Sequence, residues 1–286
     1  MICSVCGSDT GRIAAISGQR VIYRCLNCGV HLLHPQLTDR ELHELYGEAY
    51  YKSWGVSGRS ENEAVRRMKT GTFELRLDLI SGYKRSGNIL DVGCATGYFL
   101  EAAKKRGFQA YGIEISDYSC AIAKSKFGEA MVYQGMLENC PFPEKHFDVI
   151  AMSDLLEHVR DPYKTLQAAR RLLKNDGVIM LMTPDTDSLT RKLMRGKWTH
   201  YKAEHFFYFN RRSINYLAAR TGFVADHFEA AKKSINFEYI YTQFKAYPHC
   251  LLSPLSDFLH WVLPCALRSK NFRITMGEMV VILRNT

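Results

Sequence analysis

Short apolar runs alternate with longer helical patterns through the central and C-terminal parts of the chain. Runs of strand length, rich in Val, Ile, Leu and Phe, predict strands at 88–92, 109–113, 131–134, 147–152 and 177–183. Apolar residues at helical spacing predict helices at 98–106, 117–127, 161–174 and 211–221. Strands that alternate with helices in this way favour a doubly wound, Rossmann-like α/β fold with a mostly parallel sheet.

Two segments near the C-terminus, 223–230 and 275–284, are expected to complete a seven-stranded sheet. Between them we expect a helical insertion at about 232–272, before the last strand. Its residues 250–267 are amphipathic and interrupted by prolines. This pattern favours a cap over a pocket or a contact between subunits, with peripheral contact to a membrane or a lipid-linked substrate as the alternative.

The first part of the chain follows a different pattern. It begins with a β-prone segment suited to a small ribbon, followed by a short helix for which Asp39 is the expected N-cap. An aromatic segment with a loop at 55–60, interpreted as a lid hinge, precedes a helical pattern at 61–83. The chain therefore divides into a ribbon at 1–34, a helical and aromatic linker and lid at 35–84, and an α/β domain at 85–286.

Four of the nine cysteines form two Cys-x2-Cys pairs, Cys3 with Cys6 and Cys25 with Cys28, and a glycine follows each pair. Two such hairpins aim four thiolates at one ion, which predicts a zinc ribbon. A site filled by four protein ligands is structural, and the metal would supply the folding energy of this small segment. His31 and His34 follow the second pair and are interpreted as polar loop residues rather than spare ligands.

The strand expected at 88–92 runs into Asp91-Val-Gly-Cys-Ala-Thr-Gly97, after which a helix begins. Glycine lets the backbone approach a bulky ligand, and the helix presents free N–H groups at the same place. Glu114 ends the next strand, roughly 20 residues further on, where an acidic side chain can bind ribose hydroxyls. The pattern predicts a nucleoside cofactor at the carboxyl ends of a parallel sheet.

The glycine spacing here is Gly-x-x-x-Gly, whereas nicotinamide enzymes use Gly-x-Gly-x-x-Gly. The loop resembles motif I of the class I S-adenosylmethionine-dependent methyltransferases, and Asp154-Leu-Leu-Glu-His-Val159 and Glu204-His-Phe-Phe-Tyr-Phe209 extend the resemblance. It implies S-adenosylmethionine as cofactor. The residues expected to bind it are Asp91, Gly93, Cys94, Gly97, Glu114, Ile115, Gln134, Gly135, Met136, Leu137 and Ser153.

Transfer of a methyl group to an alcohol needs a general base whose pKa lies near the working pH, and histidine meets this need. Glu204 and His205 lie inside the densest aromatic stretch of the chain, where ionisable groups need a partner or a purpose. We expect His205 to be the base with Glu204 orienting it, and His158 to be the second candidate. Alternatively, His205 caps the following helix and His158 positions the cofactor.

The net charge of +9 favours acidic partners, although the basic residues are grouped only in doublets. The chain start lacks the pattern of a signal peptide and no apolar run reaches membrane-spanning length, so we expect a cytoplasmic enzyme. The resemblance extends to methyltransferases of sugar and polysaccharide pathways. It implies O-methylation of a small molecule such as a sugar, a sugar nucleotide or a lipid-linked glycan precursor. The alternatives are an RNA methyltransferase whose ribbon holds nucleic acid, and a non-catalytic cofactor-binding scaffold.

Overall fold

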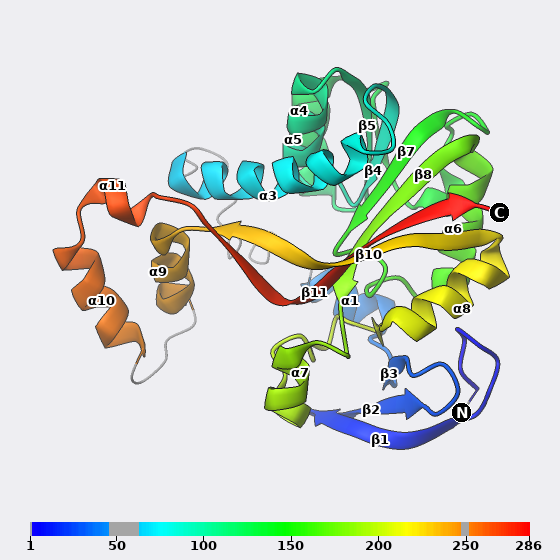
Figure 1. The fold of residues 1–286 in the computed structure, drawn as a ribbon, viewed down its shortest axis with the longest axis horizontal. Coiled ribbons are helices and arrows are strands. Elements are labelled where there is room, and N and C mark those ends of the chain that lie inside the picture. The colour runs from blue at the N-terminus through cyan, green and yellow to red at the C-terminus, as the bar shows by residue number, and fades with distance from the viewer. Residues whose placement is uncertain (1, 46–62, 247–251) are drawn as a thin grey trace.

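The computed structural model describes residues 2–45, 63–246 and 252–286, so the lid hinge expected at 55–60 lies outside the described residues. A seven-stranded sheet with strand order β10-β11-β8-β7-β4-β5-β6 forms the body of the molecule (Figure 1). Its strands are β4 (Gly87–Val92), β5 (Phe108–Glu114), β6 (Val132–Gln134), β7 (Phe147–Ser153), β8 (Leu173–Pro184), β10 (Phe223–Ile235) and β11 (Phe272–Asn285).

The five strands from β4 to β8 in this sheet run parallel, and β11 lies antiparallel between β8 and β10. Helices cover both faces, because successive residues of each strand point to opposite sides. One apolar cluster joins the sheet to α3 (Glu63–Ser81), α4 (Tyr98–Lys105) and α5 (Asp117–Phe127). The other joins it to α6 (Pro162–Leu172) and α8 (Arg211–Thr221). The expected doubly wound architecture is confirmed.

Some expected boundaries shift for local reasons. The helix expected at 161–174 ends at Leu172, because β8 already begins at Leu173. The first short helix, α1, spans Asp39–Leu45, so Asp39 is not its N-cap. Thr38 caps it instead: Thr38 Oγ1 accepts from the Glu41 N–H at 3.3 Å, and the Glu41 carboxylate accepts from the Thr38 N–H at 2.7 Å. This reciprocal pair is a capping box.

A second, four-stranded sheet contains the N-terminal ribbon and a segment distant in sequence. Its order is β1 (Thr10–Ser17), β2 (Arg20–Cys25), β3 (His31–His34) and β9 (Phe207–Tyr208). The loop interpretation of His31 and His34 is wrong, because this segment pairs with both β2 and β9. His31 is buried, and its Nδ1 lies 2.8 Å from the Tyr201 hydroxyl.

Strands β10 and β11 continue as a pair beyond β8 and carry the helical insertion away from the sheet (Figure 1). The insertion contains α9 (Phe237–Ala246), α10 (Leu252–Val262) and α11 (Cys265–Arg268). On α10 the side chains of Phe258 and Trp261 are exposed. Within the described part of the chain, none of the helices is both long enough and apolar enough to cross a membrane.

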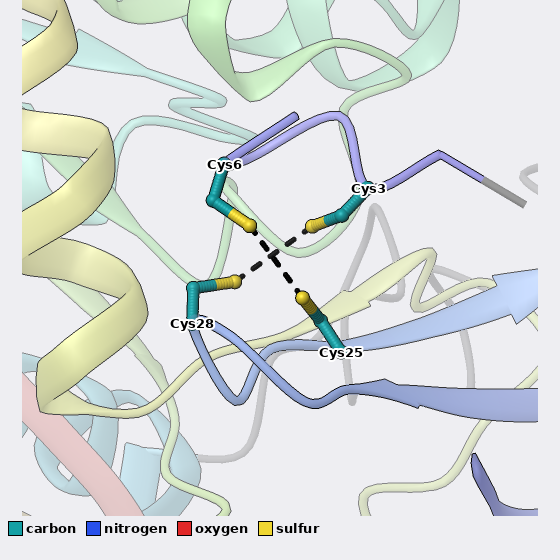
Figure 2. Close-up of side chains that lie close together, drawn as sticks. All are labelled: Cys3, Cys6, Cys25 and Cys28. Carbon is teal, nitrogen blue, oxygen red and sulfur yellow. Dashed lines mark hydrogen bonds between the residues drawn. The ribbon is translucent and has the colours of Figure 1, made fainter. Parts of the chain in front are cut away.

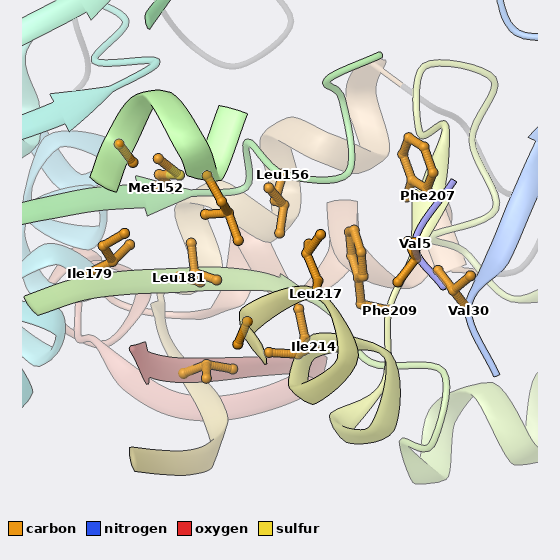
Figure 3. Close-up of a cluster of buried hydrophobic side chains, with 14 of the residues drawn as sticks. Val5, Val30, Met152, Leu156, Ile179, Leu181, Phe207, Phe209, Ile214 and Leu217 are labelled. Atoms are coloured by element: carbon orange, nitrogen blue, oxygen red, sulfur yellow. The ribbon is translucent and has the colours of Figure 1, made fainter. Parts of the chain in front are cut away.

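One apolar cluster runs from beneath the main sheet into the ribbon (Figure 3). Val5 and Val30 of the ribbon lie beside Phe207 and Phe209, which in turn lie beside Leu217 of α8 (Figure 3). All five side chains are buried. The ribbon therefore shares a core with the α/β domain, and the segment at 207–209 links the two.

Candidate functional site

The four patterned cysteines converge on one point between two turns at the N-terminus (Figure 2). Their Sγ atoms all lie within 4.8 Å of one another, with Cys3–Cys28 at 3.7 Å and Cys6–Cys25 at 3.5 Å. A disulfide would need sulfurs about 2.05 Å apart. Sulfur atoms bound tetrahedrally at about 2.3 Å from zinc lie about 3.8 Å apart. The arrangement therefore fits a tetrahedral zinc ion held by four thiolates.

The glycine loop after β4 is held against β5 by two backbone hydrogen bonds. The N–H groups of Gly93 and Cys94 donate to the Ile113 carbonyl at 2.8 and 3.0 Å. Gly97 precedes α4 with φ of 86°, and a Cβ there would lie 2.5 Å from the Phe127 ring. Both the backbone conformation and the space therefore require glycine at this position.

Two carboxyl groups meet beside this loop. Glu114 Oε2 accepts from the Ala95 N–H and Oε1 from the Ser116 N–H, both at 2.8 Å, so Glu114 holds the loops after β4 and β5. Asp91 is only 5% exposed. Burial, with the added charge of Glu114, raises the pKa of Asp91 to about 8. A ligand that brings positive charge here would restore the ionised form of Asp91.

The ends of β5 and β6 form the next part of the candidate cofactor site. Glu114 pairs with Gln134 across the two strands, and the Gly135 N–H donates to the Glu114 carbonyl at 3.0 Å. Ile115 and Met136, which follow these strands, are exposed apolar side chains available to contact a base. Leu137 is buried in the core instead.

His158 and His205 meet beyond the carboxyl end of β7, with ring centroids 4.6 Å apart. The loop bearing His205 is fixed there because the Phe206 and Phe207 N–H groups donate to the Glu157 carbonyl at 2.8 and 3.2 Å. His158 Nδ1 lies 3.1 Å from the backbone carbonyl of Glu204. That the Glu204 carboxylate orients the His205 ring stays a prediction.

Burial controls the charge of both histidines. It lowers the pKa of His158 to about 4 and the pKa of His205 well below its ordinary value. Both rings are therefore neutral at pH 7. His205 does not cap the following helix, because Asn210 occupies that position and its side chain accepts from the Ser213 N–H at 2.8 Å.

A charged group that sequence reasoning missed lies at the same end of the sheet. Lys233 Nζ is 2.6 Å from Glu278 Oε1 and 3.6 Å from Asp154 Oδ2. Burial opposes the charged form of Lys233, but the two carboxylates outweigh it and raise its pKa. Arg76 of α3 is also buried nearby and donates to the Lys232 carbonyl at 2.9 Å. The available signal was Glu278, a charged residue inside the strand expected at 275–284.

Two further residues expected to bind the cofactor are Ser153 and Gln134. Ser153 ends β7 and is partly buried, and its hydroxyl has no hydrogen-bond partner within the described ranges. Gln134 donates to the Asp117 side chain. The structure therefore gathers the predicted cofactor residues along the carboxyl ends of β4 to β7, with Leu137 beneath the surface. Ligand-binding crevices of open α/β sheets lie at this edge.

Comparison with known proteins agrees with this geometry. A family model described as a methyltransferase domain matches residues 65–227. A ubiquinone biosynthesis O-methyltransferase of Nitrosomonas europaea is 30% identical over 112 residues, which cover 37% of this chain and 48% of the relative. An uncharacterized protein of Methanocaldococcus jannaschii is 26% identical over 175 residues, covering 61% and 73% of the two chains. The chain thus spans about half the length of the ubiquinone-pathway relatives that it matches.

Solved structures support the same fold. An S-adenosylmethionine-dependent methyltransferase of Thermotoga maritima superposes with a TM-score of 0.52 at 19% identity. The superposition covers 83% of this chain and 96% of the other. The family model covers more than half of the chain and includes the glycine loop, Glu114 and His158. The protein therefore belongs to the class I S-adenosylmethionine-dependent methyltransferase family.

Proposed function

We propose that this protein transfers the methyl group of S-adenosylmethionine to a hydroxyl oxygen of a small molecule, in the first instance a sugar or sugar nucleotide. The observation that carries the proposal is the buried, neutral pair His158 and His205, which lies just beyond the end of β7. Because β7 is the neighbour of β4 in the sheet, this pair lies at the same edge as the glycine loop. The proposed base would thus lie next to the proposed cofactor site.

S-adenosylmethionine, when bound, supplies a methyl group that is already electrophilic. The chain then has three tasks. The glycine loop, Asp91 and Glu114 hold the cofactor and balance its positive charge. The loop with His205 closes the acceptor side and excludes water. His205, neutral at pH 7, accepts the proton of the acceptor hydroxyl as the oxygen attacks in line.

Two lines of support favour oxygen as the methylated atom. The ubiquinone-pathway relatives are named as O-methyltransferases, although the match covers about half of their length. A neutral histidine can accept the proton that an alcohol must lose during the reaction, and the lowered pKa of His205 makes it a weaker base than an exposed histidine. A sugar acceptor is supported by the polar groups near the histidines, including Lys233, Asp154 and Glu278, since a polyhydroxylated ligand needs several hydrogen-bond partners.

The test is a methyl-transfer screen with labelled S-adenosylmethionine over nucleotide sugars, lipid-linked glycan acceptors, phenolic acceptors and RNA. We predict that His205→Asn lowers turnover by about 10²–10⁴-fold, the usual contribution of a positioned base. Cofactor affinity measured by calorimetry should stay within about twofold, because the glycine loop is untouched. His227→Asn, on partly exposed β10, is the control and should retain full turnover.

A His205→Asn protein that melts like wild type and keeps its turnover would remove His205 from the mechanism. Methylation of RNA alone would replace the small-molecule proposal. Failure of the wild-type protein to bind S-adenosylmethionine would reject the reaction itself.

A further inference from the structure

Three side chains with metal-ligating atoms meet at the histidine pair. A carboxylate oxygen of Glu157 and one ring nitrogen each from His158 and His205 all lie within 4.8 Å of one another. Glu157 is 1% exposed and His205 is 5% exposed. His158 is partly buried, so the group is open on that side. It differs in its burial from the surface carboxylates that often lie close together without a ligand.

Several polar atoms of this group have no internal partner. Both carboxylate oxygens of Glu157 lack a hydrogen bond to any of the described residues. The same holds for the Nδ1 atom of His205. A buried polar atom without a partner costs about 1–3 kcal/mol, so native proteins rarely leave several in one place. A bound ligand would give these atoms their missing partners.

The ring of His158 is oriented as metal-binding histidines are. Its Nδ1 lies 3.1 Å from the Glu204 carbonyl. Metal-binding histidines typically donate one ring N–H to a carbonyl or carboxylate, which fixes the ring and directs the other nitrogen at the ion. The Nδ1 atom of His205, which has no partner among the described residues, is available to the same ion.

We propose that Glu157, His158 and His205 bind one divalent transition-metal ion, with coordination positions left open for oxygen atoms of the acceptor. Two imidazoles and one carboxylate suit Zn²⁺, Fe²⁺, Co²⁺ or Mn²⁺ better than Mg²⁺, which prefers oxygen ligands. The inference rests on the proposed function and changes one step of it: His205 would hold the ion instead of accepting the proton itself. The ion would lower the pKa of an acceptor hydroxyl bound to it, and the proton would pass to water.

The experiment uses Mn²⁺ and the full chain loaded with one equivalent of zinc only. Thiolate ligands hold this zinc at the four-cysteine site, so Mn²⁺ titration followed by electron paramagnetic resonance reports on the second site. Wild-type protein should bind one equivalent of Mn²⁺. Glu157→Gln keeps the side-chain shape and should weaken that binding by at least about 100-fold. The reason is that loss of a residue that only supports a metal ligand already costs about 10–100-fold in affinity, and loss of a ligand itself costs at least as much.

Asp148→Asn is the matched control, since it alters another mostly buried carboxylate at the opposite end of β7, and it should retain Mn²⁺ binding. Thermal melts and cofactor calorimetry establish that each variant is folded. The site is rejected if the wild-type chain binds no Mn²⁺ beyond background, or if Glu157→Gln binds it equally well.

The fates of the two proposals can be separated. Full methyl transfer by protein stripped of its second metal, with the ribbon zinc retained, rejects the metal site and leaves the proposed function standing. One bound Mn²⁺ equivalent that is lost in Glu157→Gln, together with no methylation of any acceptor, supports the metal site and rejects the proposed function.

Discussion

Asp91 shows how one residue links burial to ligand choice. It lies on a buried strand, and its carboxyl group interacts with that of Glu114 at the next strand end. Glu114 is used by the loops that it holds and by the ribose hydroxyls expected there. S-adenosylmethionine carries a sulfonium and an ammonium against one carboxylate, and this net positive charge would favour ionised Asp91. The elevated pKa of Asp91 is thus consistent with a positively charged cofactor.

This pair predicts a pH dependence of cofactor binding. Free Asp91 has a pKa of about 8, above its ordinary 3.8, and a bound cation lowers it, so binding releases a proton. Affinity for S-adenosylmethionine should therefore rise about tenfold per pH unit from pH 6 and level off above about pH 8. Calorimetry in buffers of different ionisation enthalpy measures both affinity and proton release. Asp91→Asn should bind weakly with a flat profile, and a flat wild-type profile would contradict the argument.

The same site residues show where sequence reasoning reached its limit. The predicted cofactor residues Asp91, Gly93, Gly97 and Glu114 could be identified from the sequence. They lie at the ends of two consecutive strands, and their spacing along the chain indicates their roles. Glu157 lies within the Asp154–Val159 motif, and no separate role was predicted for it. Its importance comes from Phe206 and Phe207 docking on its backbone, which brings His205 to it from almost 50 residues away. Such a contact leaves no periodic signal in one sequence.

At the scale of elements, the central strands were predictable because fully buried parallel strands are short apolar runs with glycine-rich ends. The pairing of β3 with β9 was not, since β9 has only two residues and its partner lies at His31–His34. The helix α7 (Leu189–Met194) was also missed, because its apolar residues Leu189 and Leu193 are exposed rather than on a buried face.

The β3–β9 pairing predicts the effect of removing metal from the four-cysteine site. Loss of zinc should loosen the ribbon, and through β9 it should displace the adjoining His205 loop. Turnover should then fall by at least about tenfold, while affinity for S-adenosylmethionine stays nearly unchanged because the glycine loop is attached to β5. Cys25→Ser with measured zinc content tests this, and Cys265→Ser, at an exposed cysteine, is the control. Equal loss of cofactor binding and turnover would show that zinc supports the whole fold instead.

At the scale of the whole molecule, the ribbon and the α/β domain share one apolar cluster (Figure 3). The division into a ribbon that ends at residue 34 and an α/β domain stays a prediction from the sequence pattern. Whether the ribbon and the α/β domain unfold independently is a separate question. Their common core runs through Phe207 and Phe209. A shared core of this kind favours one cooperative transition.

Phe209→Ala tests that cooperativity. Phe209 is fully buried between the ribbon and α8, so its truncation should cost about 3–5 kcal/mol and lower a single melting transition seen equally by far-UV and tyrosine signals. Trp261→Ala provides the contrast, because this side chain on α10 is 83% exposed and its loss should change stability by less than about 0.5 kcal/mol. Two separate transitions in the Phe209 variant would show that the ribbon and the α/β domain are independent units despite their contact. A large loss from Trp261→Ala would instead indicate that α10 is covered in solution by another molecule.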